Sequence, residues 1–91
     1  IIQEVARFYG LDTAAITGQS QNKEISTARN VSMYIIREMT QLSLAEIGQL
    51  FGGRHHSTVL NSINRVEKMM KTQPELMEII RDITNAVNSA Y

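Results

Sequence analysis

Hydrophobic residues recur at helical spacing along most of the chain, and the clearest series lies in residues 42–63. The apolar face of its first half consists of Leu44, Ile47, Leu50 and Phe51. These positions share one side of a helix. Ser43 precedes that face and Glu46 follows three residues later, which is the spacing of a capping box. We expect Gly52-Gly53 to end the helix, because glycine adopts left-handed backbone conformations without a clash.

A second apolar series follows the paired glycines and consists of Val59, Ile63, Val66 and Met70. It predicts a second helix that begins near His56. Two amphipathic helices joined by a short glycine turn have the outline of a helix-turn-helix. The second helix of that motif can enter the major groove of DNA.

The remaining chain also favours helices. Residues 1–9 predict a helix that stops at Gly10, and Asp12 is a good N-cap for a short turn that ends at Gly18. Residues 19–24 are polar and predict a loop, after which Ser26 or Thr27 caps a longer helix that ends near residue 39. A closing helix follows residues 72–74, because proline is tolerated in a first helical turn. Since no stretch alternates like a strand, we predict one all-α domain over residues 1–91, a compact bundle of about five or six helices.

The apolar spacing also predicts which positions are buried. The buried faces of the other helices are expected to contain Ile1, Val5, Phe8, Ala28, Val31, Ile35, Met39, Leu76, Ile79, Ile80, Ile83 and Val87. Arg29, Asn30, Ser32 and Arg37 are left to solvent or to a partner. Arg29 lies in the first turn of the predicted long helix, where a cation opposes the helix dipole. That placement suits an arriving phosphate, and a surface arginine without a role is the alternative.

The second helix of the motif has a polar outer side. With Val59 at the centre of the buried face, a step of 100° per residue leaves four side chains on the opposite side and Arg65 beside them. These four are Ser57, Asn61, Asn64 and Lys68. Hydroxyl, amide and ammonium groups suit base edges and phosphates. A surface helix without a partner would more often carry Glu–Lys pairs on this side.

The turn before this helix carries further candidates. Arg54 can fork onto a phosphate or onto guanine. Ser57 and Thr58 fall in the first helical turn, where an anion is favoured, although either residue could serve only as the N-cap. His55 and His56 suit hydrogen bonds to bases or backbone. Adjacent histidines point in different directions and no third ligand has suitable spacing, so no metal site is predicted.

Charge qualifies the DNA-binding interpretation. Nine basic and nine acidic residues cancel, which argues mildly against a nucleic-acid binder. However, residues 52–71 contain four basic residues against Glu67 alone, a balance of +3 that coincides with the motif. The chain has no cysteine, which fits a reducing cytoplasm, and it shows no signal peptide or bilayer-length apolar run. Because it begins at Ile1, we expect it to be a fragment of a longer protein. No residue constellation indicates an enzyme.

The segment Phe51-Gly52-Gly53-Arg54-His55-His56-Ser57-Thr58-Val59 resembles the C-terminal DNA-binding domain of the bacterial replication initiator DnaA family. Ser43-Leu44-Ala45-Glu46-Ile47-Gly48 and residues 33–40 support the resemblance, which extends over nearly the whole chain. The resemblance implies a fold like that of the Trp repressor and binding of duplex origin DNA at short boxes. It also implies that a neighbouring ATPase module of the full protein supplies oligomerisation and origin melting.

The resemblance also implies roles for individual residues. Arg54, His56, Ser57 and Thr58 would contact bases and phosphates in the major groove, and Leu44 and Ala45 would touch the DNA backbone. A basic loop of the family reaches the minor groove, and its counterpart is residues 19–26 with Lys23.

Three features of the sequence depart from the family pattern. His55 stands where the family usually has an acidic residue that could accept from cytosine or cap the helix. The loop keeps only Lys23, partly cancelled by Glu24. Ala28-Arg29-Asn30 replaces the usual Pro-Arg-Gln and keeps only the arginine. These departures predict a changed box preference or a weaker site.

The sequence therefore predicts a non-enzymatic domain that binds double-stranded DNA and uses no cofactor. We expect the isolated domain to be a monomer, and regulatory proteins are a further class of partner that the sequence leaves open. The candidate DNA-binding residues are Arg54, His55, His56, Ser57, Thr58, Asn61, Leu44, Ala45, Arg29, Lys23 and Lys68. The rival hypothesis is a protein-interaction module that kept the fold and lost DNA affinity, since the net charge is neutral and the basic loop is depleted.

Overall fold

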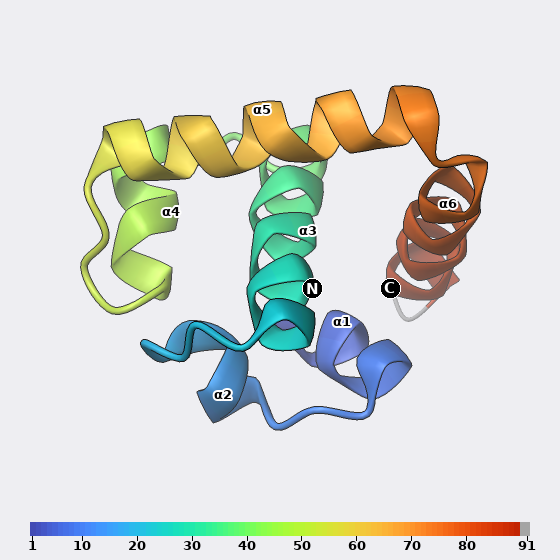
Figure 1. Ribbon diagram of the computed structural model, residues 1–91. Coiled ribbons are helices and arrows are strands. Elements are labelled where there is room, and N and C mark those ends of the chain that lie inside the picture. The colour runs from blue at the N-terminus through green and yellow to red at the C-terminus, as the bar shows by residue number, and fades with distance from the viewer. Residues whose placement is uncertain (90–91) are drawn as a thin grey trace.

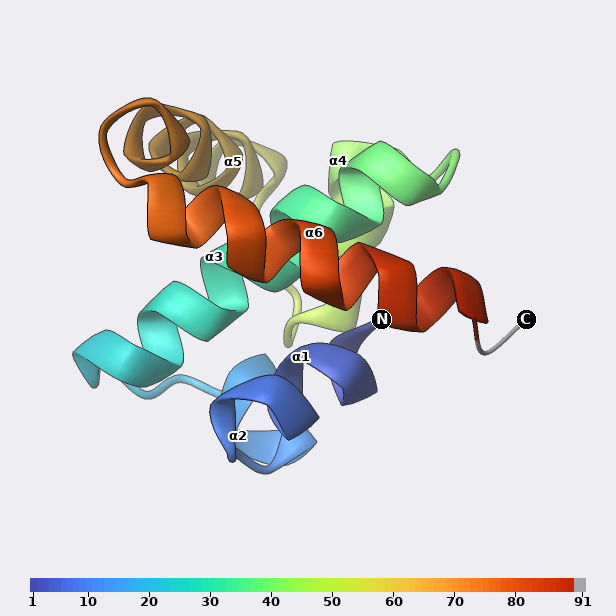
Figure 2. The ribbon, with the colours of Figure 1, turned by 90° about the vertical axis from the view of Figure 1, so that its right-hand side faces the viewer.

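A computed structural model describes residues 1–89 as helices joined by short loops. In chain order the helices are α1 (Ile2–Tyr9), α2 (Thr13–Thr17), α3 (Lys23–Met39), α4 (Leu44–Leu50), α5 (His56–Thr72) and α6 (Pro74–Ser89). Helix α3 runs through the centre, α5 lies across one of its ends, and α1 and α2 lie at the other (Figure 1). A quarter turn shows α6 passing across α3 (Figure 2). Six helices and no strand among these residues confirm the all-α prediction.

The central position of α3 determines the core. This helix contacts all five other helices, so it is buried on more than one face. Ala28, Val31 and Ile35 are buried as predicted. Ser32 is buried as well, and its hydroxyl donates to the Ala28 carbonyl at 2.8 Å. The prediction that Ser32 and Arg29 face solvent is wrong. It assumed a single buried stripe on α3, whereas this helix packs against other helices on more than one side.

Helix α3 also begins earlier than predicted. Asn22 is its N-cap, and the Oδ1 atom accepts from the backbone N–H groups of Glu24 at 2.9 Å and Ile25 at 3.3 Å. Neither Ser26 nor Thr27 is the cap, since both lie inside the helix. The polar loop therefore ends at residue 22, and the last residues of the predicted basic loop are helical.

The other predicted boundaries hold, and the predicted burial holds in most places. Helix α1 stops at Gly10 and α6 begins at Pro74. Phe8 was expected to be buried, but it is 49% exposed because α1 turns Val5 and Ala6 toward the core. The residues that were expected to be buried but are only half-buried are Ile1, Leu44, Met39, Met70 and Ile79. Within residues 1–89, no helix has both the length and the apolar character needed to cross a bilayer.

The capping box of α4 forms as predicted. The Ser43 hydroxyl accepts from the Glu46 backbone N–H at 3.1 Å, and the Glu46 carboxylate accepts from the Ser43 N–H at 3.0 Å. Because the hydrogen bond from the Ser43 backbone N–H favours the ionised carboxylate, the pKa of Glu46 lies below its usual value. Ile47 and Phe51 are buried, whereas Leu50 is 45% exposed, contrary to the prediction.

A tight turn connects α4 to α5. Gly52 and Gly53 have φ angles of 78° and 79°, in the left-handed region that glycine enters most easily. The carbonyl oxygen of Gly48 accepts from the backbone N–H groups of Phe51, Gly53 and Arg54 at 3.0–3.1 Å. The turn therefore closes back onto α4, and this contact fixes the direction in which α5 leaves.

Candidate nucleic-acid interface

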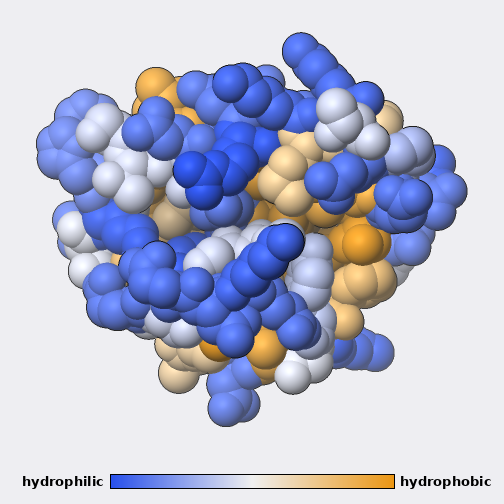
Figure 3. Space-filling model, in the orientation of Figure 1, coloured by the Kyte–Doolittle hydropathy of each residue, from blue (hydrophilic) through white to orange (hydrophobic). Residues whose placement is uncertain are grey.

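Helix α5 has one buried side and one exposed side. Val59, Ile63 and Val66 are buried, and the helix packs mainly on α3 and α4. The exposed side carries the predicted polar residues Ser57, Asn61, Asn64, Arg65 and Lys68. Hydrophilic side chains gather over α5 in the space-filling view, and hydrophobic surface appears between α3 and α6 (Figure 3). The predicted orientation of α5 is therefore confirmed.

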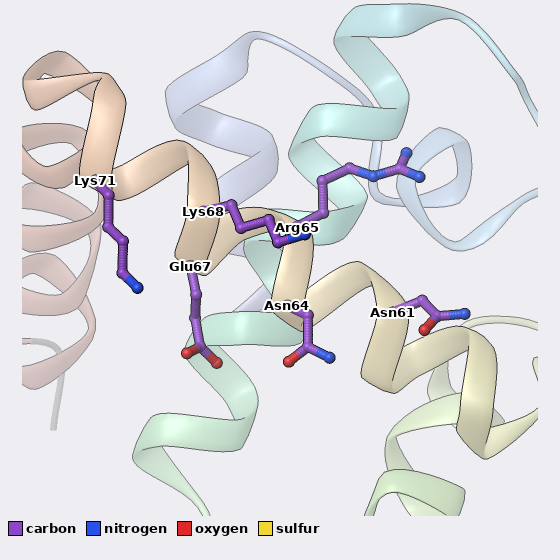
Figure 4. Close-up of a pocket in the computed structure, with 6 residues that line it drawn as sticks. All are labelled: Asn61, Asn64, Arg65, Glu67, Lys68 and Lys71. Atoms are coloured by element: carbon purple, nitrogen blue, oxygen red, sulfur yellow. The ribbon is translucent and has the colours of Figure 1, made fainter.

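A shallow groove runs along the exposed side of α5. It is lined by Asn61, Asn64, Arg65, Glu67, Lys68 and Lys71, which Figure 4 shows on successive turns of this helix. Within residues 1–89, the three cations of the groove form no ion pair, so their charge is available to a ligand. Lys71 was not predicted as a site residue. The positive balance of residues 52–71 was the signal that could have found it.

The N-terminus of α5 is capped by His55. Its Nδ1 atom accepts from the Ser57 backbone N–H at 3.2 Å and lies 2.8 Å from the Ser57 Oγ. The imidazole rings of His55 and His56 stack, with centroids 4.1 Å apart and planes at 35°. The alternative in which Ser57 or Thr58 is the N-cap is wrong. Both hydroxyl residues are exposed, and His55 provides the cap.

Arg54 connects the turn to the end of α2. One terminal nitrogen donates to the Phe51 carbonyl at 2.6 Å, and the other donates to the Gly18 carbonyl at 2.8 Å. The side chain is only half-buried, and a guanidinium has five N–H groups. Arg54 therefore stabilises the turn, and it still has donors for a second partner. The contact also brings the loop after α2 next to the start of α5.

Arg29 does not lie on the candidate surface. It is 5% exposed, and its guanidinium donates to the carbonyls of Ile16 at 2.7 Å, Ser20 at 2.9 Å and Ala15 at 3.2 Å. Burial and the nearby charge of Arg54 hold the pKa of Arg29 below its usual value. The expectation of a solvent-facing Arg29 is wrong, because this side chain satisfies carbonyls at the end of α2 instead.

Three further candidates lie near the turn. Ala45 is exposed and Leu44 is half-buried in the first turn of α4, which packs on α5. Lys23 is exposed at the start of α3, directly after the loop that Arg54 contacts. Leu44 and Ala45 therefore lie on a helix that contacts α5, whereas Lys23 lies at the end of α3 that is next to α1 and α2 (Figure 1), and Lys68 lies farther along α5.

The buried position of Arg29 predicts a stability effect. Arg29→Met is expected to lower the free energy of unfolding by about 2–4 kcal/mol, because it leaves carbonyls without their charged donor. The change is measured by urea denaturation. Arg37→Met is the matched control, because Arg37 is exposed and, among residues 1–89, donates to the Leu42 carbonyl alone. Equal, small losses in both variants would contradict the structural role of Arg29.

A short helix, a glycine turn and a longer helix with an exposed polar side define an all-α protein of the helix-turn-helix class. Residues 1–66 match the family model described as the bacterial dnaA protein helix-turn-helix. The chain belongs to this family, which confirms the resemblance seen in the sequence.

The chain is similar to proteins named chromosomal replication initiator protein DnaA. It is 42% identical over 86 residues to the protein from Thermus thermophilus, a match that covers 94% of this chain and 20% of the relative. It is 38% identical over 90 residues to the protein from Lactiplantibacillus plantarum, covering 98% of this chain and 20% of the relative. The protein from Roseiflexus castenholzii is 40% identical over 91 residues, a match that covers 99% of this chain and 19% of the relative. The chain thus spans about one fifth of the length of these relatives.

Proposed function

We propose that this domain binds double-stranded DNA in a sequence-specific manner, at short boxes like those that the family recognises at a replication origin. The observation that carries the proposal is the exposed side of α5. This side presents amide, hydroxyl and basic groups, while the opposite side of the same helix is fixed in the core. The rigid attachment leaves the polar groups preorganised for a partner.

The dimensions and chemistry of α5 suit the major groove. Its 17 residues give a length of about 25 Å, and a helix of about 10–12 Å diameter fits a groove about 12 Å wide. Ser57 and Asn61 lie in the N-terminal half, where hydroxyl and amide groups can read base edges. Arg65 and Lys68 lie farther along and supply charge for phosphates.

The neighbouring elements extend the proposed contact. Arg54 holds the loop after α2 beside the start of α5, so Lys23 and this loop can approach the adjacent DNA backbone. Leu44 and Ala45 lie at the N-terminus of α4, where free backbone N–H groups favour a phosphate. Arg29 is not included in the proposed contact because it is buried.

The names of the relatives extend this proposal to the longer protein. We infer that the domain places a cytoplasmic initiator of chromosomal replication on its origin, as a monomeric unit of a longer chain. ATP hydrolysis and oligomerisation are assigned to segments outside these 91 residues.

An anisotropy titration tests the proposal with a fluorescent DnaA-box duplex and a scrambled duplex of equal composition. We expect the box to bind at least about tenfold more tightly near physiological salt. Four phosphate contacts, by Arg54, Arg65, Lys68 and Lys23, would give a slope of log affinity against log salt of about −3.6. Equal, weak binding of both duplexes would contradict the proposal.

Thr58→Ala is expected to weaken box binding by about 1–3 kcal/mol without unfolding the domain. The residue is exposed at the start of α5, where its hydroxyl can contact a base or a phosphate. Thr72→Ala is the matched control, since Thr72 is exposed at the other end of α5.

Arg54→Ala should lower both affinity and stability, because its guanidinium also donates to Phe51 and Gly18. Unchanged affinity in the Thr58 and Arg54 variants would place the site elsewhere.

The neutral net charge and the single lysine at the start of α3 favour a second candidate, a protein-interaction module with weak DNA affinity. The same titration separates the two functions. Submicromolar binding that falls steeply with salt would exclude the second candidate, and its absence would support it.

A further inference from the structure

The contact between His55 and Ser57 fixes the position of a proton. The Ser57 backbone N–H donates to the His55 Nδ1 atom at 3.2 Å. A backbone N–H can only donate, so this Nδ1 atom acts as an acceptor and carries no hydrogen. The geometry of this hydrogen bond therefore fits the His55 tautomer that carries its hydrogen on Nε2.

The same tautomer determines the role of the Ser57 hydroxyl. Its Oγ atom lies 2.8 Å from the His55 Nδ1 atom, and two acceptors cannot form a hydrogen bond with each other. The hydroxyl is therefore the donor, and its single hydrogen is directed at His55. Ser57 is exposed, so the lone pairs of its Oγ atom are the groups that this hydroxyl can still offer to a partner.

We propose that His55 makes Ser57 a specificity-determining residue that only accepts hydrogen bonds. In the major groove, adenine N6 and cytosine N4 donate, whereas guanine O6 and thymine O4 accept. Ser57 then favours an adenine or cytosine at the base that it faces. It also disfavours a phosphate oxygen, which is an acceptor too. This inference rests on the proposed function, since it concerns the same contact of α5 with duplex DNA.

Thr58 provides an internal comparison. Within residues 1–89, its hydroxyl has no hydrogen bond to another residue, so it can rotate and either donate or accept. A free hydroxyl tolerates any of the groups that bases or phosphates offer. The two adjacent hydroxyl residues therefore differ in what they accept from DNA, because within residues 1–89 the His55 ring contacts the hydroxyl of Ser57 and not that of Thr58.

The DNA test uses the 91-residue chain and a panel of duplexes in which each base pair of the preferred box is replaced in turn. The unmodified chain should favour an amino-bearing base at one position by about three- to tenfold, the effect of one hydrogen bond. Ser57→Ala should abolish that preference. His55→Ala should reduce it to less than about twofold, because the freed hydroxyl can then donate. His55→Asp should retain it, because a carboxylate accepts from both the N–H and the hydroxyl of Ser57.

A loss of affinity that is the same for every duplex would overturn the inference. If His55→Ala weakens all duplexes equally and the base preference stays, His55 is only a helix cap. A preference that survives in Ser57→Ala would overturn the inference as well. Circular dichroism confirms that each variant is folded before binding is compared.

A measurement without DNA tests the tautomer of His55 directly. Long-range ¹H–¹⁵N correlation spectra of the imidazole should show the Nε2–H tautomer for His55, and the Nδ1–H tautomer would overturn the inference. If the tautomer is as expected but no duplex is preferred, the proposed function fails and this inference fails with it. If one duplex is preferred and His55→Ala leaves that preference intact, only this inference fails.

Discussion

Gly48→Ala is expected to destabilise the domain by at least about 3 kcal/mol, one of the two largest effects that we predict for a single substitution. A Cβ atom at this position would overlap the carbonyl oxygen of Arg54, which is backbone and cannot rotate away. The Gly48 carbonyl also accepts three N–H groups of the following turn. Relief of the overlap would therefore separate the turn from α4 and break these bonds.

Thermal unfolding measures the effect of this substitution. For a domain of this size, the predicted loss lowers the melting temperature by more than about 12 °C. Gln49→Ala is the matched control, because Gln49 is the next residue of α4 and is exposed. It should change the melting temperature by less than about 3 °C. Similar melting temperatures for the two variants would contradict the described contact between α4 and the turn.

The second large effect is expected for Val59→Asp. Val59 is fully buried on α5, and an aspartate there would place an unpaired carboxylate in the core. The expected cost of about 3–5 kcal/mol is comparable to the total stability of a small domain, so the variant should be largely unfolded. Far-ultraviolet circular dichroism and urea denaturation measure the loss.

Asn61→Asp is the matched control, because it introduces the same side chain two residues farther along α5 on the exposed side. This variant should keep its melting temperature within about 3 °C and lose most DNA affinity, since its carboxylate repels phosphates. A folded Val59→Asp variant, or an unfolded Asn61→Asp variant, would show that the assignment of the two sides of α5 is rotated.

Local sequence signals predicted the helix-turn-helix well. The Ser43 and Glu46 capping box depends on residues three positions apart, so the sequence contains everything needed to find it. The glycine turn and the side of α5 that contains Val59 are local in the same sense. The exposed polar groove follows from that periodicity, which explains why the exposed side of α5 was predicted correctly.

Contacts between distant segments could not be predicted from the same signals. Arg29 is buried because α2 presents the carbonyls of Ala15 and Ile16 to it, and those lie 14 and 13 residues earlier in the chain. Arg54 likewise contacts Gly18 across 36 residues. The periodicity of a helix carries no information about contacts between distant segments. The side chains of Arg29 and Arg54 were therefore expected to be free to bind a ligand.

Caps made by unexpected residues account for two further errors. Asn22 belongs to a polar stretch without periodicity, so its role as the cap of α3 was missed. The cap of α5 was sought among Ser57 and Thr58 because hydroxyl residues are preferred there, and His55 occupies the position instead. A histidine cap in place of a hydroxyl cap changes which hydrogen-bonding groups the start of α5 offers.

Chemical-shift mapping is the most direct test of the claim that the exposed side of α5 docks into a duplex groove. The ¹⁵N-labelled chain is titrated with a duplex that contains the box. The account predicts the largest amide shifts in residues 54–68, with smaller shifts at the N-termini of α3 and α4. Shifts that cluster on α6, or no shifts at all, would contradict it.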